Sequence, residues 1–167
     1  MLNAGISADD DEKIGLLIKK IPLEDFLTKN PIELNDEKVA SFTSIIAAKP
    51  IVRQLLLTIQ RDIILQPESI VAEGRDVGTV VYPEADFKIF LTASLETRVK
   101  RRQKQLEEHG KATSYDNLYN DLKLRDQRDQ DRALAPLKAA NDALVIDGSD
   151  LTIEQILERI LLFIGRL

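Results

Sequence analysis

Three short, largely apolar segments constrain the fold more than any other feature of the sequence. They are IVA at residues 70–72, FKIFL at 87–91 and ALVI at 143–146. Short apolar runs of this kind are typical of strands that are covered on both faces of a parallel sheet. Helical patterns separate the three runs, and strands that alternate with helices predict an α/β fold with a doubly wound parallel sheet. Ligands bind such sheets beyond the carboxyl ends of the strands.

Three helices are predicted before the first of these strands. An acidic stretch at residues 8–12 opens a short helix that Pro22 ends, and apolar residues recur at helical spacing over 36–48. Pro50 then begins a helix whose apolar face extends to Leu65. Residues 23–34 show a mixed pattern that we interpret as a loop or a weak hairpin.

Three further helices are predicted after residue 91. One begins at Leu95 with Ser94 as its cap, and a second carries the sequence LRDQRDQDR at 124–132 and ends at Pro136. The last follows a capping box of Thr152 and Gln155. Its apolar stripe is the clearest in the chain: Ile153, Ile156, Leu157, Ile160, Leu161 and Ile164. Between the first two of these helices, polar residues 107–117 predict a mobile flap.

Composition limits the classes of function. The 167 residues, 44% hydrophobic and 31% charged, fit one globular domain, and a net charge of −5 argues against binding a nucleic acid polymer. With no cysteine and a single histidine, the sequence offers neither a thiolate nor a multi-histidine metal site, and we expect no protein-held metal. No apolar run is long enough to span a membrane. The absence of cysteine fits a reducing, cytoplasmic location, and we expect a monomer.

A polar cluster follows the first predicted strand. Arg75 and Asp76 lie together between Gly74 and Gly78, where glycine lets the backbone approach a ligand closely. The guanidinium donates in a fixed fork and the carboxylate only accepts, which suits a ligand bearing both an anion and an amine. The alternative is a solvated turn with a local ion pair.

A second charged cluster lies in the predicted helix at 124–132. Arg125, Asp129 and Arg132 fall at positions i, i+4 and i+7 and should share one helix face, where they could converge on one ligand. The alternative is an exposed ladder of ion pairs. The preceding helix carries a cationic run, which is either a solvated face or an anion site. The run consists of Arg98, Lys100, Arg101, Arg102 and Lys104.

Three segments together resemble the bacterial cytidylate kinases, which are nucleoside monophosphate kinases. They are EGRDVGTVVYPEADFKIFLTAS, RVKRRQKQL and RDQRDQDRALAPLKAANDALVIDGS, in the family's order and spacing. The resemblance covers about residues 39–164 and implies a P-loop kinase-like fold. It also implies transfer of a phosphoryl group from ATP to CMP or dCMP, with Mg²⁺ bound through the nucleotide.

The resemblance assigns roles to individual residues. The positions that recognise the cytosine base are Ser44, Arg53 and Asp76. The arginines that hold the acceptor phosphate, and so act in catalysis, are Arg75 and Arg132, while Arg125 and Asp129 match the pair near the sugar. Candidates to approach the ATP phosphates from the base of the lid are Arg98, Arg101 and Arg102.

One part of the family pattern is missing from the sequence. No G-x-x-x-x-G-K-[ST] motif occurs, although its backbone amides and Lys normally hold the ATP phosphates. By resemblance, the strand before that motif would lie between the strands at 70–72 and 87–91. We therefore expect one domain, with a degenerate insert at 1–38, a core at 39–164 and a lid at about 104–120, that is inactive without a P-loop. The alternatives are a non-catalytic CMP-binding remnant and a regulatory or interaction module.

Overall fold

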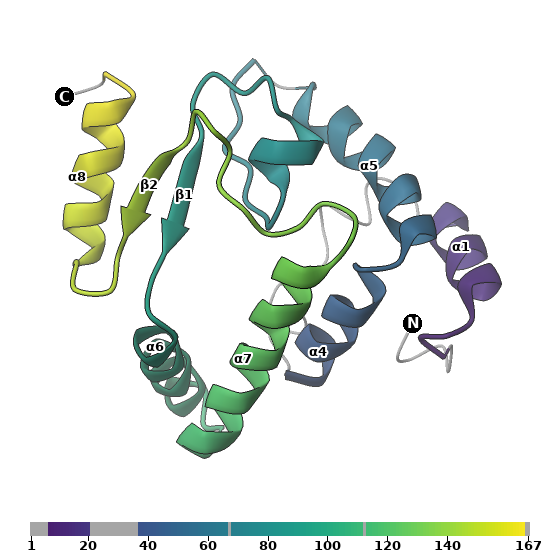
Figure 1. Ribbon diagram of the computed structural model, residues 1–167, viewed down its shortest axis with the longest axis horizontal. Helices are drawn as coiled ribbons and strands as arrows, with labels where there is room; N and C mark the ends of the chain where they lie inside the picture. The colour runs from purple at the N-terminus through teal and green to yellow at the C-terminus, as the bar shows by residue number, and fades with distance from the viewer. Residues whose placement is uncertain (1–6, 21–36, 67, 112, 166–167) are drawn as a thin grey trace. The chain divides into compact units, whose positions relative to one another are not determined.

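The structure, a computed structural model, describes residues 7–20, 37–66, 68–111 and 113–165 (Figure 1). The chain divides into two compact units. The first comprises Met1–Gly74 and Arg128–Pro136, and the second comprises Arg75–Gln127 and Leu137–Leu167. None of the helices in the described ranges combines the length and the hydropathy that a membrane span needs.

Three helices form the first unit: α1 (Asp11–Lys20), α4 (Glu37–Ile46) and α5 (Pro50–Ile64). All three agree with the helices predicted there, and proline stands at the start of α5 as expected. Their apolar positions recur at helical spacing and form one core, in which Ile14, Ile18, Ile46 and Val52 are buried. The predicted loop or hairpin at 23–34 lies outside the described residues.

Two parallel strands form the sheet of the second unit. β1 (Ile89–Thr92) pairs with β2 (Leu144–Asp147) in the register Ile89 to Leu144 and Thr92 to Asp147. Two more backbone bonds extend the ladder, from Leu144 N to Lys88 O at 2.9 Å and from Gly148 N to Thr92 O at 2.8 Å. The α/β class, the second and third predicted strands and the parallel direction of the sheet are therefore confirmed.

The prediction of a strand at residues 70–72 was wrong. Residues 70–72 are not a strand in the structure, and the side chain of Val71 is fully exposed. An extended segment becomes a strand only when a neighbouring strand completes its hydrogen-bond ladder. In the part of the chain that the structure describes, the sheet consists of β1 and β2, and residues 70–72 do not join it. The observed sheet is thus smaller than the doubly wound sheet that we predicted. The segment instead leads into a single turn of π-helix, η2 (Val77–Val81).

Helix α6 (Leu95–Glu108) lies side by side with α7 (Tyr115–Asp131), which belongs to the second unit as far as Gln127 (Figure 1). Val99, Leu106 and Leu118 are buried between them. Ser94 caps α6 as predicted, because its Oγ accepts a bond from the amide of Thr97 at 3.2 Å.

Helix α7 ends earlier than predicted. Its last residue is Asp131, five residues before Pro136. The residue before a proline is disfavoured in the helical conformation, and Ala135 has a φ of 52°. The side chain of Arg132 donates from Nε to the carbonyl of Ala135 and fixes this reversal of the chain.

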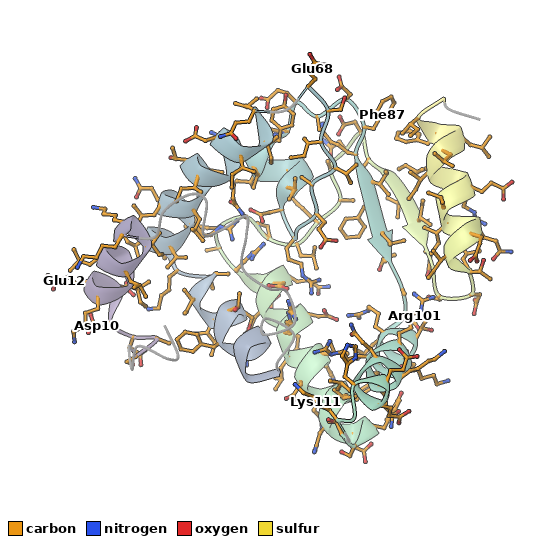
Figure 2. The ribbon with its side chains drawn as sticks, turned by 180° about the vertical axis from the view of Figure 1, so that it is seen from behind. Asp10, Glu12, Glu68, Phe87, Arg101 and Lys111 are labelled. Carbon is orange, nitrogen blue, oxygen red and sulfur yellow. The ribbon has the colours of Figure 1, made fainter. Side chains whose placement is uncertain are left out.

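The last helix, α8 (Ile153–Phe163), runs alongside the strand pair (Figure 1). The predicted capping box of Thr152 and Gln155 is present, with both reciprocal hydrogen bonds formed. The helix approaches the end of β2 closely, since a Cβ added at Gly148 would lie 3.0 Å from Ile156 Cδ1. At its other end, the ring of Phe163 meets Phe87 edge to face, with centroids 5.8 Å apart (Figure 2).

The apolar stripe of α8 is largely exposed in the structure. No residue of α8 is buried, and the side chain of Ile153 is 80% exposed. Two strands are too narrow to cover a helix face of three turns, so the apolar stripe of α8 extends beyond the sheet.

Candidate functional site

In the first unit, one end of α4 meets the chain around the end of α7. The guanidinium of Arg128 donates from Nη1 to Ser44 Oγ at 3.0 Å, across 84 positions of sequence. Ser44 is 6% exposed, and it is one of the residues that the resemblance assigns to the base. The contact places a serine hydroxyl in a buried position beside a cation.

Next to Arg128 lies a buried pair of opposite charges. Arg132 Nη1 and Asp129 Oδ1 are 3.7 Å apart, and their side chains are only 5% and 6% exposed. Removing two charges from water costs several kcal/mol per ion, so such a pair is weak evidence for stability. Buried charges of this kind are typical of sites that bind a charged ligand, and both residues belong to the predicted acceptor site.

Arg53 lies in the same unit on α5. Its Nη1 donates to the carbonyl of Ala47 at 3.1 Å, so the guanidinium is held against the turn between α4 and α5. Ser44, Arg53, Asp129 and Arg132 thus all belong to the first unit, where they come from α4, from α5 and from the end of α7 with the residue that follows it.

The remaining predicted acceptor-site residues, Arg75, Asp76 and Arg125, belong to the second unit. Asp76 is 9% exposed and directly precedes η2. Its carbonyl accepts bonds from the amides of Thr79, Val80 and Val81 at 3.2, 2.9 and 3.3 Å. π-Helical turns are rare and occur frequently at functional sites, and this one fixes the backbone of the Arg75–Asp76 pair.

The three predicted lid arginines all have partners within the second unit. Arg98 forms a bidentate pair with Asp126 of α7, at 3.1 Å from Nη1 to Oδ1 and 2.6 Å from Nη2 to Oδ2. Arg101 donates to the carbonyl of Gly148 at 2.6 Å, where α6 meets the end of β2 (Figure 2). Arg102 donates to Gln105 Oε1 at 2.7 Å along its own helix. Their approach to ATP phosphates stays a prediction.

The carboxyl ends of the two strands are joined by side-chain hydrogen bonds. Ser149 Oγ accepts from the amide of Ser94 at 2.8 Å and donates to Asp147 Oδ1. Hydrogen bonds from the hydroxyl and then the amide of Ser149 lower the pKa of Asp147 below its ordinary 3.8. This edge is where a parallel sheet binds its ligands, and these bonds hold the loops after β1 and β2 together.

Sequence reasoning missed Arg128. It lies three residues after Arg125 and four before Arg132, so it satisfies the same helical spacing as the three residues that were chosen. The signal was therefore present in LRDQRDQDR, but nothing in the sequence indicates that this arginine contacts Ser44. Among the residues that the structure describes, no three His, Cys, Asp or Glu side chains gather as metal ligands.

Comparison with known proteins agrees with the resemblance. A family profile described as "Cytidylate kinase" matches residues 4–166. A cytidylate kinase of Pseudomonas fluorescens (strain SBW25) is 50% identical over 129 residues, which are 77% of this chain and 56% of that protein. A cytidylate kinase of Bordetella bronchiseptica is 51% identical over 131 residues, which are 78% of this chain and 58% of that protein.

A third relative, the cytidylate kinase of Methylococcus capsulatus, is 48% identical over 122 residues, or 73% of this chain and 54% of that protein. The matches thus cover somewhat more than half the length of each curated relative. Together with the family profile, which spans nearly all 167 residues, they confirm the resemblance. This chain belongs to the cytidylate kinase family.

Proposed function

We propose that this chain forms the acceptor side of a cytidylate kinase, which transfers a phosphoryl group from ATP to CMP or dCMP and yields CDP or dCDP. The observation that carries this proposal is the buried Asp129–Arg132 pair beside the hydrogen bond from Arg128 to Ser44. Charged groups that are buried in this arrangement suit a charged, hydrogen-bonding ligand. The names of the relatives support a cytidine nucleotide as that ligand.

The chemistry of cytosine fits the three residues assigned to the base. Cytosine presents an exocyclic amine, which donates, and a ring carbonyl, which accepts. The Asp76 carboxylate can accept from the amine, while Arg53 and the hydroxyl of Ser44 can donate to acceptors of the base. Both Ser44 and Asp76 are buried, so a base lacking the matching groups would give up hydrogen bonds to them in a place with little access to water.

The acceptor phosphate and the sugar fit the remaining residues. Arg75 and Arg132 can hold a phosphate dianion through bidentate contacts, and Arg125 with Asp129 can bind the sugar hydroxyls. Phosphoryl transfer needs chiefly positioning and charge neutralisation, so residues that fix the acceptor phosphate contribute directly to the rate.

The donor side of the reaction is not supplied by these residues. In P-loop kinases, ATP phosphates lie on the P-loop amides and Mg²⁺ is held partly by the P-loop Ser or Thr. The sequence contains no such motif, so the ATP and Mg²⁺ site of the family does not fit these 167 residues alone, and no step is assigned to the metal. The missing motif favours a second candidate function, which is CMP binding without phosphoryl transfer.

Calorimetric titration with CMP, UMP, AMP and GMP tests the proposed acceptor site. We expect CMP to bind more tightly than either purine nucleotide. Replacing Asp76 with Ala should weaken CMP binding by about 1 to 3 kcal/mol, because a polar group of the buried base loses its partner. Equal affinity for all four nucleotides, or no CMP binding at all, would overturn the proposal.

A further inference from the structure

The contact between Arg128 and Ser44 joins the last turn of α7 to α4, two segments of the first unit that are distant in sequence. Arg128 belongs to α7 and reaches Ser44 near the end of α4, with the guanidinium donating to Oγ at 3.0 Å. The same stretch of chain carries Asp129 and Arg132, the buried ion pair. A side chain at this position can therefore act on the base side of the site while its neighbours act on the sugar and phosphate.

The direction of this hydrogen bond follows from chemistry. A guanidinium has donors only, so Ser44 Oγ must be the acceptor in the contact. The contact with Arg128 therefore does not use the single hydroxyl proton of Ser44, and it restricts the directions in which the hydroxyl can donate. A hydrogen bond to a cationic donor is about twice as strong as a neutral one, so the rotation of the hydroxyl is restrained.

From this geometry we infer that Arg128 is a positioning residue, which orients the Ser44 hydroxyl to donate to an acceptor atom of the nucleotide base. The inference rests on the proposed function, in which Ser44 faces the cytosine. Ring carbonyl O2 and ring nitrogen N3 of cytosine are both acceptors. Arg128 acts through Ser44, and it restrains the hydroxyl before the nucleotide arrives, which lowers the entropic cost of binding.

An effect of Arg128 on nucleotide binding has a second explanation, which the test must distinguish from the positioning role. An arginine next to Arg132 could act on the nucleotide simply as a positive charge near the phosphate. A positioning role predicts the same loss of affinity for CMP and for cytidine, because both contain the base. A charge near the phosphate predicts a loss for CMP alone. A general structural role predicts a loss that does not depend on the Ser44 hydroxyl.

The test is a double-mutant cycle on the full chain, with CMP and cytidine titrated by calorimetry. We expect Arg128→Ala to weaken the binding of both ligands by the same factor, about 10- to 150-fold, the range for one charge-assisted hydrogen bond. In a Ser44→Ala background, Arg128→Ala should cause almost no further loss. Arg159→Ala, which removes an exposed arginine from α8, is the matched control and should leave both affinities unchanged.

A conservative variant keeps the test decisive if Arg128→Ala unfolds. Only one nitrogen of Arg128 contacts Ser44, so Arg128→Lys should retain most of the affinity and a normal thermal melt. Unchanged binding by Arg128→Ala, a loss confined to CMP, or an undiminished loss in the Ser44→Ala background would each overturn the inference while the proposed function stands. Failure of the wild-type chain to bind CMP would overturn the proposed function, and the inference with it.

Discussion

Helices α1 and α8 both carry a regular apolar stripe, but they bury it to very different extents. In α1, Ile14 is fully buried and Ile18 nearly so, because α5 packs along the helix within the same unit. In α8, no residue is buried, and Leu157 is 51% exposed although it lies in the middle of the stripe. The strands beside α8 share this exposure, since Leu91 and Val145 are also more than half exposed.

The difference teaches that helical periodicity identifies the face to be covered but not the element that covers it. In the first unit a neighbouring helix supplies the cover from within the described chain. In the second unit a sheet of two strands leaves apolar area in contact with water, which is unfavourable by about 25 cal/mol per Å². The sheet side should therefore be the weaker half of the molecule, and four experiments test this contrast.

The largest expected effect is on turnover. We expect the 167 residues alone to give no measurable phosphoryl transfer from ATP to CMP, because the sequence has no P-loop. Fusing an in-frame strand and P-loop segment should restore turnover and cooperative unfolding together, since the added strand would cover β1. A coupled assay and a thermal melt measure the two properties.

A matched control separates the two effects of the added segment. With the P-loop Lys replaced by Ala, the added strand should restore the melt without restoring turnover. Robust turnover by the unmodified chain would contradict the argument from the missing motif and would mean that another segment binds ATP.

Deleting side chains from the two stripes should have unequal effects on stability. Ile14→Ala should lower the free energy of unfolding by about 2 to 5 kcal/mol, because it opens a cavity in a closed core. Ile153→Ala removes a side chain that is 80% exposed, and we expect a change within about 0.5 kcal/mol. Urea unfolding measures the free energy of unfolding of both variants. Equal losses of stability would contradict the contrast between the two helices.

Removing the N-terminal cap of α8 should lower the stability more than removing an exposed side chain from the same helix. Thr152→Ala removes half of the capping box and should cost about 1 kcal/mol of stability. Glu158→Ala, at an exposed position within the same helix, is the control and should change stability very little. Urea unfolding of the two variants gives the answer, and equal stability of the cap variant and the wild type would rule out this role for the cap.

The smallest effect concerns pH. Hydrogen bonds from Ser149 lower the pKa of Asp147, and the contact with Lys88 lowers the pKa of Asp142 below the ordinary 3.8. A carboxyl whose pKa is lower in the folded state stabilises the fold above the ordinary value, and this stabilisation is lost as the pH falls through the folded pKa. Thermal melts from pH 6 to pH 3 should show a small decrease that Asp147→Asn reduces. An identical pH profile in that variant would argue against the contribution of Asp147.

Much of the fold could be predicted from local sequence patterns. The apolar spacing of α1 and α5, the cap at Ser94 and the capping box at Thr152 are local signals, and the structure confirms them. The strand at 70–72 could not be predicted safely, because a strand depends on a partner that may be distant in sequence. The early end of α7 depends on the conformation of Ala135, which no apolar pattern reports.

The candidate site was predictable only in part. Charge spacing in LRDQRDQDR indicates that several residues could act together, and the structure shows Asp129 and Arg132 as a buried pair. Arg128 and Ser44 are 84 residues apart in the sequence. Their contact depends on the tertiary fold, so it could not be predicted from a single sequence. The roles given to all the assigned residues, Ser44, Asp129 and Arg132 included, stay predictions.

The most direct test of the acceptor site is a calorimetric titration of CMP and of cytidine into the wild type and Arg132→Ala. The account predicts that Arg132→Ala weakens CMP binding by about 1.5 to 3 kcal/mol and cytidine binding far less, because cytidine has no phosphate to lose. Arg132→Lys, which retains the charge near Asp129 but not the bidentate fork, should recover only part of the loss. If the folded variants bind CMP as tightly as the wild type, Arg132 does not hold the acceptor phosphate and the central claim is wrong.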